Sequence, residues 1–563
     1  MFKSITLIES LPDSILLHIF SFLDGPDIAR GACVCSRWRN VAYDDSLYRA
    51  LLQTVYKVKV KDGLAKGKDC WRSEYKRLFF NVPTELSETL TDHTDEVLHI
   101  SFSHKGHLFS TTSKDCTIKV WEVGYPTKLK YDFNFAKKFK WNFTQFSCFN
   151  SNDTRLLVSS VKSGDIDRRG FVAILSVEKS FDLLKIVCMD PSQLFGAWLN
   201  IETFLGGSLD INLDGRALVS VHIEAFDVGT SEPISTQDFT QYSNDIITEP
   251  DDAKVLFTFC SETASLIKFL TVVKDMSSDR PINLSTKPNE SVENVMHDSN
   301  LCTGNCNCQL DLVTQAYLKD GVTSSGENIS ASAASASSDK SDSRLIYVTG
   351  EFAVALHQVG VKLIPKDILS KPDLDDVESH MVMHVSNHEI GIRPDWKPDS
   401  SDQMIDLNGH VTGLCLSKDN RYLFVNCRPW VGQVNRDDPW NTPVLSRDIE
   451  IRVIDLWDLS DTGIRYVGHQ GLSPSTMCCF VFLNTSDDYV GSGSENCRGY
   501  LWDRSYGCIL STYQHGPGVV NAVAFNPVNQ EYFVTVSDDQ TIKIWRSKSE
   551  MAKLKKLENN KQK

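Results

Sequence analysis

Two groups of residues have the side chains that bind metal ions, and the first is a set of three histidines. His380, His384 and His388 would share one face of a helix, where imidazoles can bind zinc. The stretch Met381–Val385, however, alternates like a strand. No Glu stands between the first two histidines, as a zinc protease requires. We therefore interpret all three as surface or core histidines.

The second group consists of three cysteines in a polar region. Cys302, Cys306 and Cys308 have His297 nearby, but they lack the paired Cys-x-x-Cys spacing of a zinc site. Free thiols are the simpler interpretation. We predict neither a metal nor a cofactor.

Motifs for covalent or phosphoryl-transfer chemistry are missing from the sequence. It contains no Gly-rich phosphate loop and no Gly-x-Ser-x-Gly nucleophile elbow. Since no nucleophile and base are paired in a recognisable pattern, we predict that the chain has no catalytic residues and is not an enzyme.

Composition narrows the class of ligand. The chain has 563 residues, of which 41% are hydrophobic and 23% charged, as in soluble globular proteins. Its 58 basic and 73 acidic side chains give a formal net charge of −15. Nucleic acid is therefore excluded as the main ligand, because phosphate binding needs a basic surface. No apolar run is long enough to predict a membrane span.

The compartment follows from the N-terminus and the cysteines. The first residues turn polar by Glu9, so their apolar stretch is too short for a signal peptide. We expect a cytoplasmic protein, with the nucleus possible, whose 16 cysteines are reduced thiols.

The first 50 residues have the pattern of short helices. Gly25-Pro26 breaks the first helix, and Asp24 and Asp27 flank the break as candidate caps. A further helical stretch carries Val34, Trp38 and Val41, and another helix is predicted near residues 68–80. One face of the first helix is apolar and is formed by Ile15, Leu16, Ile19, Phe20 and Leu23.

From residue 90 the sequence changes to short strands with turn signals, and three stretches resemble one another. Each begins with a His and ends with a Trp, at spacings of 28, 33 and 30 residues. A weaker fourth copy begins at Gly409-His410 and is interrupted by an insertion at residues 428–447. The three pairs are His93 and Trp121, His469 and Trp502, and His515 and Trp545.

These repeats resemble WD repeats, which have about 40–45 residues and four strands per propeller blade. In that family His, Ser or Thr, Asp and Trp form a hydrogen-bonded chain that holds the blade together. Asp115 and Asp539 stand six residues before their Trp, as the chain requires, whereas Asn496 replaces Asp in the middle copy. The resemblance assigns structural roles to His93, Asp115, Trp121, His469, Trp502, Asp503, His515, Asp539 and Trp545.

The resemblance implies a mainly β fold, a WD-repeat β-propeller preceded by an all-α unit. Seven blades would have roughly 55 residues each, and eight shorter ones are not excluded by counting. Residues 123–265 are less regular and are interpreted as degenerate blades. The predicted divisions are an N-terminal helical unit at 1–50, a helical linker at 51–90, blades at 91–274, a disordered insertion at 275–344, further blades at 345–547 and a basic disordered tail at 548–563.

The N-terminal unit resembles an F-box. The pattern is Leu-Pro from Leu11, then Ile-Leu-x-x-Ile-Phe-x-x-Leu from Ile15, then Val-Cys-x-x-Trp from Val34. An F-box docks on the Skp-one adaptor of a cullin-RING ubiquitin ligase, as apolar helix anchors enter a partner's groove. The resemblance assigns adaptor binding to Leu11, Pro12, Ile15, Leu16, Ile19, Phe20, Leu23, Ile28, Val34, Cys35 and Trp38.

Both units together resemble the F-box/WD-repeat family, whose members receive substrates for ubiquitin ligases. This implies a protein substrate on the propeller face and degradation as the outcome. A scaffold for trafficking or cytoskeletal assembly, without a ligase, is the alternative. Trp502-Asp503-Arg504 has its Arg one place early for docking the DNA-damage-binding cullin adaptor, so that partner is only weakly indicated. Arg428, Trp430 and Trp440 suit either a substrate contact or blade packing.

Overall fold

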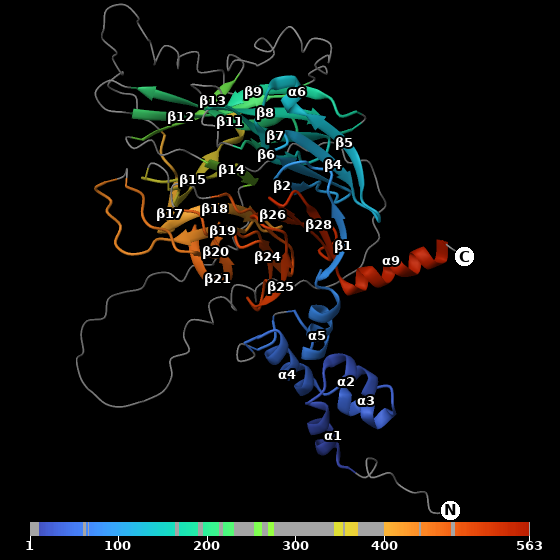
Figure 1. The fold of residues 1–563 in the computed structure, drawn as a ribbon. Helices are drawn as coiled ribbons and strands as arrows, with labels where there is room; N and C mark the ends of the chain where they lie inside the picture. Colours follow the sequence, from blue (N-terminus) through green and yellow to red (C-terminus); the bar gives the residue numbers. More distant parts are fainter. Residues whose placement is uncertain are drawn as a thin grey trace, which may run out of the picture.

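The structure is a computed structural model, and it describes residues 11–59, 63–65, 67–163, 168–178, 180–189, 195–212, 218–229, 253–261, 268–274, 343–352, 355–369, 399–438, 441–474 and 479–561. It consists of an N-terminal group of helices and a β-propeller (Figure 1). None of the helices in these ranges is long and apolar enough to cross a membrane.

The propeller has seven four-stranded antiparallel sheets, so the predicted seven blades are confirmed. Each blade except the last takes its strands in chain order. The first three are β2 (Val97–Phe102), β3 (Leu108–Ser113), β4 (Thr117–Glu122) and β5 (Lys128–Asn134); β6 (Phe143–Phe149), β7 (Arg155–Ser163), β8 (Arg168–Ser176) and β9 (Leu183–Met189); and β10 (Ala197–Trp198), β11 (Thr203–Asn212), β12 (Leu218–Asp227) and β13 (Lys254–Ser261).

The degenerate blades predicted between residues 123 and 265 are therefore regular sheets.

The next three blades are β14 (Lys268–Lys274), β15 (Ser343–Thr349), β16 (Gln358–Ile364) and β17 (Gln403–Asp406); β18 (Gly409–Leu416), β19 (Tyr422–Pro429), β20 (Asp448–Asp455) and β21 (Ser460–Gln470); and β22 (Leu483–Thr485), β23 (Tyr489–Ser492), β24 (Arg498–Asp503) and β25 (Ile509–Gln514). Two short helices, α6 (Phe135–Phe139) and the 3-10 helix η5 (Lys366–Leu369), lie in connections.

The last blade closes the ring with a strand from the other end of the propeller. It contains β26 (Val520–Phe525), β27 (Tyr532–Ser537) and β28 (Ile542–Arg546), and β1 (Glu85–Leu90) pairs antiparallel with β28. The predicted linker at 51–90 is thus wrong at its end, because residues 85–90 are a propeller strand. Closing the ring this way leaves no blade incomplete and joins the two ends of the chain.

Among the described residues, five helices precede β1, and they form one unit that we call the helical domain (residues 11–82). Its helices are α1 (Asp13–Phe20), α2 (Gly25–Gly31), α3 (Ser36–Ala42), α4 (Asp45–Val55) and α5 (Trp71–Phe80). The predicted boundary at residue 50 falls inside α4. It is wrong physically as well, since Leu52, Tyr75 and Leu78 share one core with the first helices. The helix predicted near residues 68–80 is confirmed as α5.

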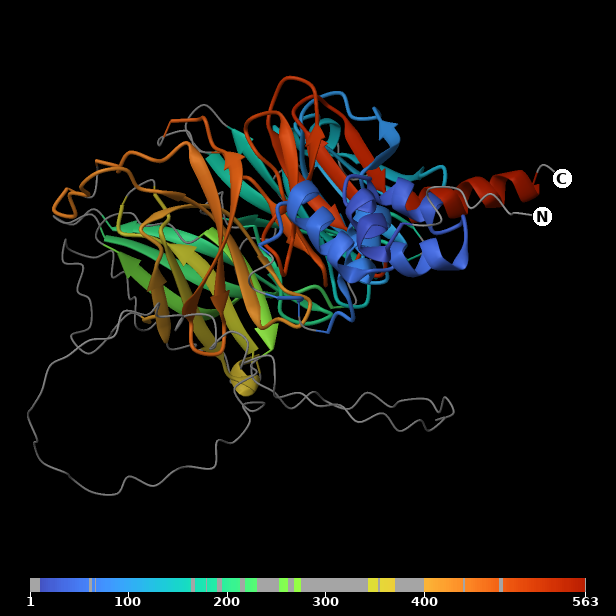
Figure 2. The same cartoon turned by 90° about the horizontal axis from the view of Figure 1, so that it is seen from below.

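The core of the helical domain continues into the propeller. Tyr75 and Leu78 of α5 belong to the same buried cluster as Tyr489, Tyr513 and Phe533 of the last two blades. Figure 2 shows the helices against the blades of the C-terminal part of the chain. The helical domain is therefore packed on the propeller rather than tethered to it.

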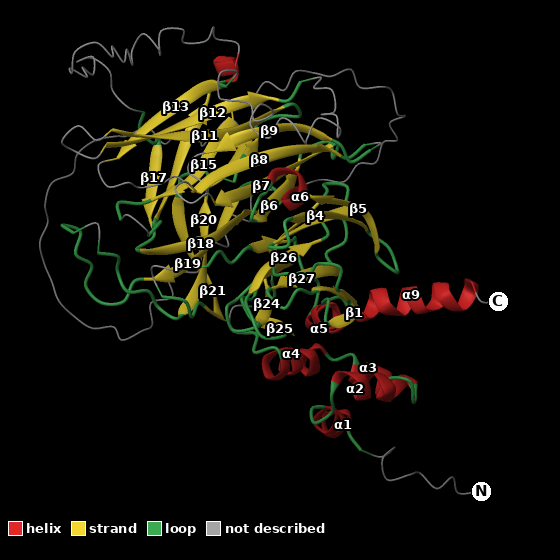
Figure 3. Cartoon of the chain, turned by 45° about the horizontal axis from the view of Figure 1, so that its top comes forward, coloured by secondary structure: helices red, strands yellow, loops and turns green. Residues whose placement is uncertain are grey.

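The C-terminal segment differs from the prediction of a disordered tail. Residues Lys548–Lys561 form α9, which projects from the side of the propeller that carries the helical domain (Figure 3). Its start is capped by Ser547, whose hydroxyl accepts the backbone N–H of Glu550. Composition had suggested disorder, but the segment is rich in the strong helix formers Lys, Leu, Glu, Met and Ala.

Several predictions fall outside the described residues. The insertion predicted at 275–344 joins β14 to β15, and residues 275–342 are not described. The histidine trio at 380–388, the cysteines at 302–308 and Trp440 also lie outside. Within the described residues there is no group of three or more His, Cys, Asp or Glu that could hold a metal ion.

Candidate functional site

An apolar surface on α1 is the first candidate for partner binding. Ile15, Ile19 and Phe22 lie at positions i, i+4 and i+7 and are 43%, 42% and 75% exposed. Pro12 is exposed one turn earlier, and Val34, between α2 and α3, is 63% exposed. Large apolar side chains at helical spacing, left in water, are typical of a surface that a partner covers. We call Pro12, Ile15, Ile19 and Phe22 the α1 face.

The structure divides the residues that the sequence assigned to the adaptor. Pro12, Ile15, Ile19, Val34 and Cys35 are exposed, whereas Leu11, Leu23 and Trp38 are partly buried. The remaining three form the core of the helical domain and offer no surface to a partner, so the prediction of direct contact is wrong for them. They are Leu16, Phe20 and Ile28, at 1%, 2% and 0% exposure.

Sequence analysis missed Phe22, a member of the α1 face that is more exposed than Ile15 and Ile19. Its ring packs edge-to-face on His18, at 5.0 Å between centroids. The helical spacing from Ile15 and Ile19 could have identified it, but α1 ends at Phe20, so the periodicity was cut short.

Local contacts hold α1 and α2 in place. The Arg37 Nε donates to Asp13 at 2.7 Å, which ties α3 to the start of α1. Asp24 caps α2 as predicted, since its carboxylate accepts the backbone N–H of Asp27 at 2.8 Å. Gly25 lets α2 approach α5 closely, because a Cβ there would lie 2.3 Å from the Tyr75 ring. These contacts fix the direction of the α1 face relative to α5.

A buried ion-pair network attaches α5 to the propeller. Arg77 donates to Asp503 at 2.6 Å and to Glu74 at 2.9 Å, and the exposed fractions of these three side chains are 11%, 1% and 2%. Burial alone would lower the pKa of the Arg77 guanidinium, but its bonds to Glu74 and the charge of Asp503 outweigh burial and raise it. The network therefore stays ionised. Sequence analysis did not find it because Arg77 and Asp503 are more than 400 residues apart.

Further contacts extend the attachment. Lys68 pairs with Asp488 at 3.1 Å, and the Tyr513 hydroxyl donates to the Pro83 carbonyl at 2.9 Å. The Tyr506 hydroxyl accepts the backbone N–H of Ala65. Asp488 and Tyr506 lie in the β22–β23 and β24–β25 connections. We call the side of the propeller formed by these connections the linker face.

The opposite side, which we call the distal face, carries the connections of the β3–β4 and β27–β28 type. Antiparallel strands make successive connections alternate between the two ends of a blade. The distal face therefore points away from the attachment of α5. It contains the buried histidines of the repeats.

The predicted hydrogen-bonded chain is present in the last blade. Trp545 Nε1 donates to Thr535 Oγ1 at 3.0 Å, and that hydroxyl lies 2.7 Å from His515 Nε2. His515 Nδ1 lies 3.0 Å from Asp539. Burial alone would raise the pKa of Asp539, but hydrogen bonds from His515, Thr541 and Gly516 lower it. A neutral His515 then donates to a carboxylate that remains charged.

The first blade repeats the same arrangement. Trp121 Nε1 donates to Thr111 Oγ1 at 3.0 Å, Thr111 contacts His93 Nε2 at 2.9 Å, and His93 Nδ1 reaches Asp115 at 2.8 Å. The structural roles predicted for these residues and for the last blade are supported by these distances.

Replacing Asp539 by Ala should destabilise the propeller. The change leaves the buried His515 Nδ1–H with only the Thr541 hydroxyl, at 3.2 Å, as an acceptor. It also removes the acceptor of the Gly516 and Thr541 backbone N–H groups, so we expect a loss of about 3 kcal/mol in the free energy of unfolding. Chemical denaturation followed by tryptophan fluorescence measures it. Asp92→Ala, at an exposed carboxylate near the equivalent turn of the first blade, serves as the control and should change stability by no more than about 0.5 kcal/mol. Equal effects of the two substitutions would contradict the structural role.

The middle repeat departs from the chain, as Asn496 suggested. His469 Nε2 lies 3.0 Å from Asn426 Oδ1, and Asn496 bonds Tyr500 instead. Trp502 Nε1 donates to the Val467 carbonyl. Asp503, predicted to be structural, turns the β24–β25 connection and accepts Arg77. The Trp502-Asp503-Arg504 triplet is thus engaged within the chain, which leaves the weakly indicated second adaptor without support from this triplet.

Acid should weaken the fold through His469. Burial lowers the pKa of His469 to about 3. Its Nδ1 has no hydrogen-bond partner, so a proton added there would find no acceptor. An unfolded His takes up a proton near pH 6.5. Stability from this group is therefore complete above pH 6.5 and is lost progressively as the pH falls toward 3, at up to about 1.4 kcal/mol per pH unit.

Unfolding midpoints measured between pH 7 and pH 5 test this dependence. His469→Gln should reduce the slope, whereas His18→Gln, on the exposed side of α1, should leave it unchanged. A slope that is the same in both variants would show that His469 does not carry the effect.

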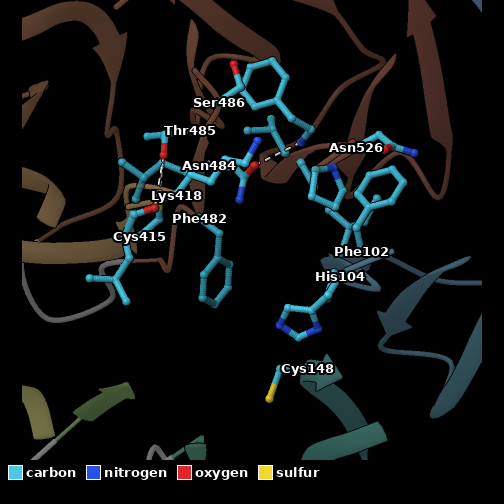
Figure 4. A pocket seen from close by; sticks show the side chains of 18 of the residues that line it. Phe102, His104, Cys148, Cys415, Lys418, Phe482, Asn484, Thr485, Ser486 and Asn526 are labelled. Carbon is cyan, nitrogen blue, oxygen red and sulfur yellow. Dashed lines mark hydrogen bonds between the residues drawn. The ribbon is translucent and has the colours of Figure 1, made fainter. Parts of the chain in front are cut away.

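A cavity of about 560 Å³ opens on the linker face at the end of the central channel. Figure 4 shows Phe102 and Phe482 among its side chains, with His104, Lys418 and Asn526 from the β2–β3, β18–β19 and β26–β27 connections. At its mouth Lys418 pairs with Asp487, and His104 Nδ1 lies 2.9 Å from Asp153. Glu531 adds a second lining carboxylate, which accepts the Ser547 hydroxyl.

The β19–β20 insertion bears on two of the three residues for which substrate contact and blade packing were left open, Arg428 and Trp430. Arg428 is 2% exposed and donates to the carbonyls of Ser446 and Ser473. The Trp430 ring packs against Phe352 and His357 of the neighbouring blade. Both side chains therefore support the blades, and Arg428 is too buried to contact a substrate, whereas Trp430 stays partly exposed.

Comparison with known proteins agrees with the division of the chain into a helical domain and a propeller. The family model described as F-box-like matches residues 8–54, and the WD domain, G-beta repeat matches residues 84–122 and 507–546. Over 95% of its length the chain is 31% identical to F-box/WD repeat-containing protein 5 of Homo sapiens, covering 94% of that protein. It is 30% identical to the protein of the same name in Rattus norvegicus, again over 95% of this chain and 94% of the relative. A shorter match, 32% identical over 26% of this chain and 24% of the other, is to GID complex subunit 7 of Schizosaccharomyces pombe.

Proposed function

The chain belongs to the F-box/WD-repeat family, and on this premise we propose that it is the substrate-recognition subunit of an SCF-type cullin-RING ubiquitin ligase. The helical domain would dock the Skp-one adaptor through the α1 face. The propeller would hold the protein that is to be ubiquitinated for degradation, in the cytoplasm or the nucleus.

The observation that carries this proposal is the exposed apolar α1 face within the F-box-like match. Ile15, Ile19 and Phe22 are exposed although the domain has a complete core of its own with α5. Burying such side chains in a partner contributes about 1.5–3 kcal/mol each. A helix that only braced the propeller would instead turn these residues inward.

Positioning is the chemical contribution that a receptor of this kind makes. Bringing a substrate near the charged ubiquitin carrier raises its effective concentration, and no nucleophile is needed in this chain. The shared core and the Arg77 network support such a role, since they fix the distance between adaptor and substrate.

Reconstituted ubiquitin transfer tests the proposal. Full-length chain would be combined with purified adaptor, cullin, RING protein, ubiquitin carrier and ubiquitin, and modification of the chain and of bound proteins would be followed with time. We expect transfer that requires both the chain and the adaptor. Transfer that is unchanged without the adaptor, or a chain that never joins the complex, would favour the scaffold alternative. Point variants are preferable to deleting residues 1–50, because that deletion would cut α4 and open the shared core.

A further inference from the structure

A second cavity, of about 350 Å³, opens on the distal face at the other end of the channel. Phe143, Phe480 and Phe482 line it, together with Gln145 and Asn521. Phe482 also lines the cavity of the linker face and packs against His99 at 4.6 Å between ring centroids. Aromatic rings therefore close the middle of the channel and form the floor of the distal cavity.

The charged groups of this cavity are mostly acidic. Glu96, Asp538 and Lys114 line it, and Lys114 forms an ion pair with Glu96. Burial alone would lower the pKa of Lys114, but Glu96, Asp538 and Asp95 together raise it. One ammonium group thus stands among three carboxylates, and the cavity keeps a net negative charge.

Asp538 is held in place at the rim. Its two carboxylate oxygens accept the side-chain amide of Asn521 at 2.7 Å and the backbone N–H of Val519 at 2.9 Å. A fixed carboxylate loses little freedom when a cation approaches it. Aromatic faces also attract cations, so the phenylalanine floor and the acidic rim both favour a cationic ligand.

We propose that the distal cavity binds a basic side chain, Arg or Lys, of an exposed segment of the protein substrate, which names the substrate class for the receptor function proposed above and rests on it. The incoming cation would lie over the phenylalanine floor and pair with Glu96 and Asp538, displacing Lys114 from Glu96. A phosphorylated or acidic segment would be repelled by the same carboxylates.

The cavity of the linker face is less suited to this ligand. Its two lining carboxylates already have partners, since Asp487 pairs with Lys418 and Glu531 accepts the Ser547 hydroxyl. It also shares its face with α5, where Asp488 and Tyr506 bind the helical domain. This face therefore supplies matched control residues for the distal cavity.

Fluorescence anisotropy with defined peptides tests the inference. The probes are fluorescein-labelled Gly-Ser peptides of equal length that contain Arg, Ala or Glu at the same positions, and the protein is the full chain. At physiological ionic strength, where the Debye length is about 8 Å, we expect the Arg peptide to bind best. The Glu96→Gln/Asp538→Asn variant should weaken that binding about tenfold, since each partly exposed carboxylate contributes roughly threefold to fivefold.

A variant that removes the positive charge of the cavity should bind more tightly, and a gain in affinity cannot be explained by misfolding. Lys114→Met removes the internal competitor and should tighten the Arg peptide severalfold. At the linker face, Lys418→Met removes the same charge as Lys114→Met, and Asp487→Asn removes one of the two acidic charges changed in the distal variant; both controls should leave binding unchanged. Equal effects at the two faces would reduce the result to attraction by the chain's net charge and overturn the inference, as would a preference for the Glu peptide.

The same samples separate this inference from the receptor function. Adaptor capture without selective Arg-peptide binding would refute the cavity assignment alone. Selective peptide binding by a chain that does not capture the adaptor would refute the receptor function alone, and the cavity would then be a basic-segment site of a scaffold.

Discussion

Replacing Ile15 and Ile19 by Asp should abolish capture of the Skp-one adaptor while the chain remains folded. Both side chains are exposed by more than 40%, so the substitutions need not disturb the core of the helical domain. In the complex they would be buried anchors worth about 1.5–3 kcal/mol each, and their loss alone weakens binding at least about 100-fold. Unpaired carboxylates in an apolar groove would weaken it further. Co-purification and a quantitative binding assay would measure the effect.

The matched control for this variant is Val55→Asp. Val55 is 57% exposed near the end of α4 and does not belong to the α1 face. It should leave adaptor capture unchanged. Circular dichroism and the unfolding midpoint should show that all variants keep the fold. Loss of capture in both variants would indicate general damage to the helical domain. If the Ile15/Ile19 variant still captures the adaptor, the adaptor binds to a surface other than the α1 face.

Breaking the Arg77–Asp503 pair should uncouple the helical domain from the propeller. Arg77→Met leaves the nearly fully buried Asp503 without its cation, and Glu74 keeps only the more distant Lys68 at 3.8 Å. Removing one partner of a buried pair costs about 3–5 kcal/mol. We expect a lower unfolding midpoint and faster proteolysis between residues 59 and 84. Adaptor binding should remain, since the α1 face is untouched, but ubiquitin transfer to a bound substrate should slow as the geometry loosens.

Two comparisons make this result specific. The double variant Arg77→Met/Asp503→Asn should be less destabilised than the sum of the single variants, because no unpaired aspartate charge remains at that position. Asp487→Ala, which removes a partner from the exposed Lys418 pair, should cost no more than about 1 kcal/mol. If Arg77→Met leaves both stability and ubiquitin transfer unchanged, the network does not fix the helical domain.

The sequence allowed much of the propeller to be predicted, because its repeats encode local contacts. His93, Asp115 and Trp121, like His515, Asp539 and Trp545, occur within one blade at fixed spacing, and the structure joins them as expected. Asn496 correctly indicated the altered middle repeat. The closing strand β1 was missed, since its partner β28 is more than 450 residues away and residues 85–90 contain mixed polar and apolar side chains.

The candidate surfaces were predicted only in part. Helical periodicity identified the apolar residues of α1 but could not tell Leu16 and Phe20, which are buried in the core of the helical domain, from Ile15 and Ile19, which face water. That distinction depends on which helices pack where. The distal cavity was not predicted at all, because Glu96, Asp538 and Phe482 come from three blades that only the closed ring brings together.

The most direct test of the central claim is a calorimetric titration of purified Skp-one adaptor into the purified full-length chain. The receptor function predicts a one-to-one complex with a Kd below about 1 µM and a negative heat-capacity change, since the α1 face buries apolar side chains on binding. The Ile15→Asp/Ile19→Asp variant should give no measurable heat of binding. A wild-type chain that is folded yet shows no binding to the adaptor would contradict the account and leave the propeller as a scaffold.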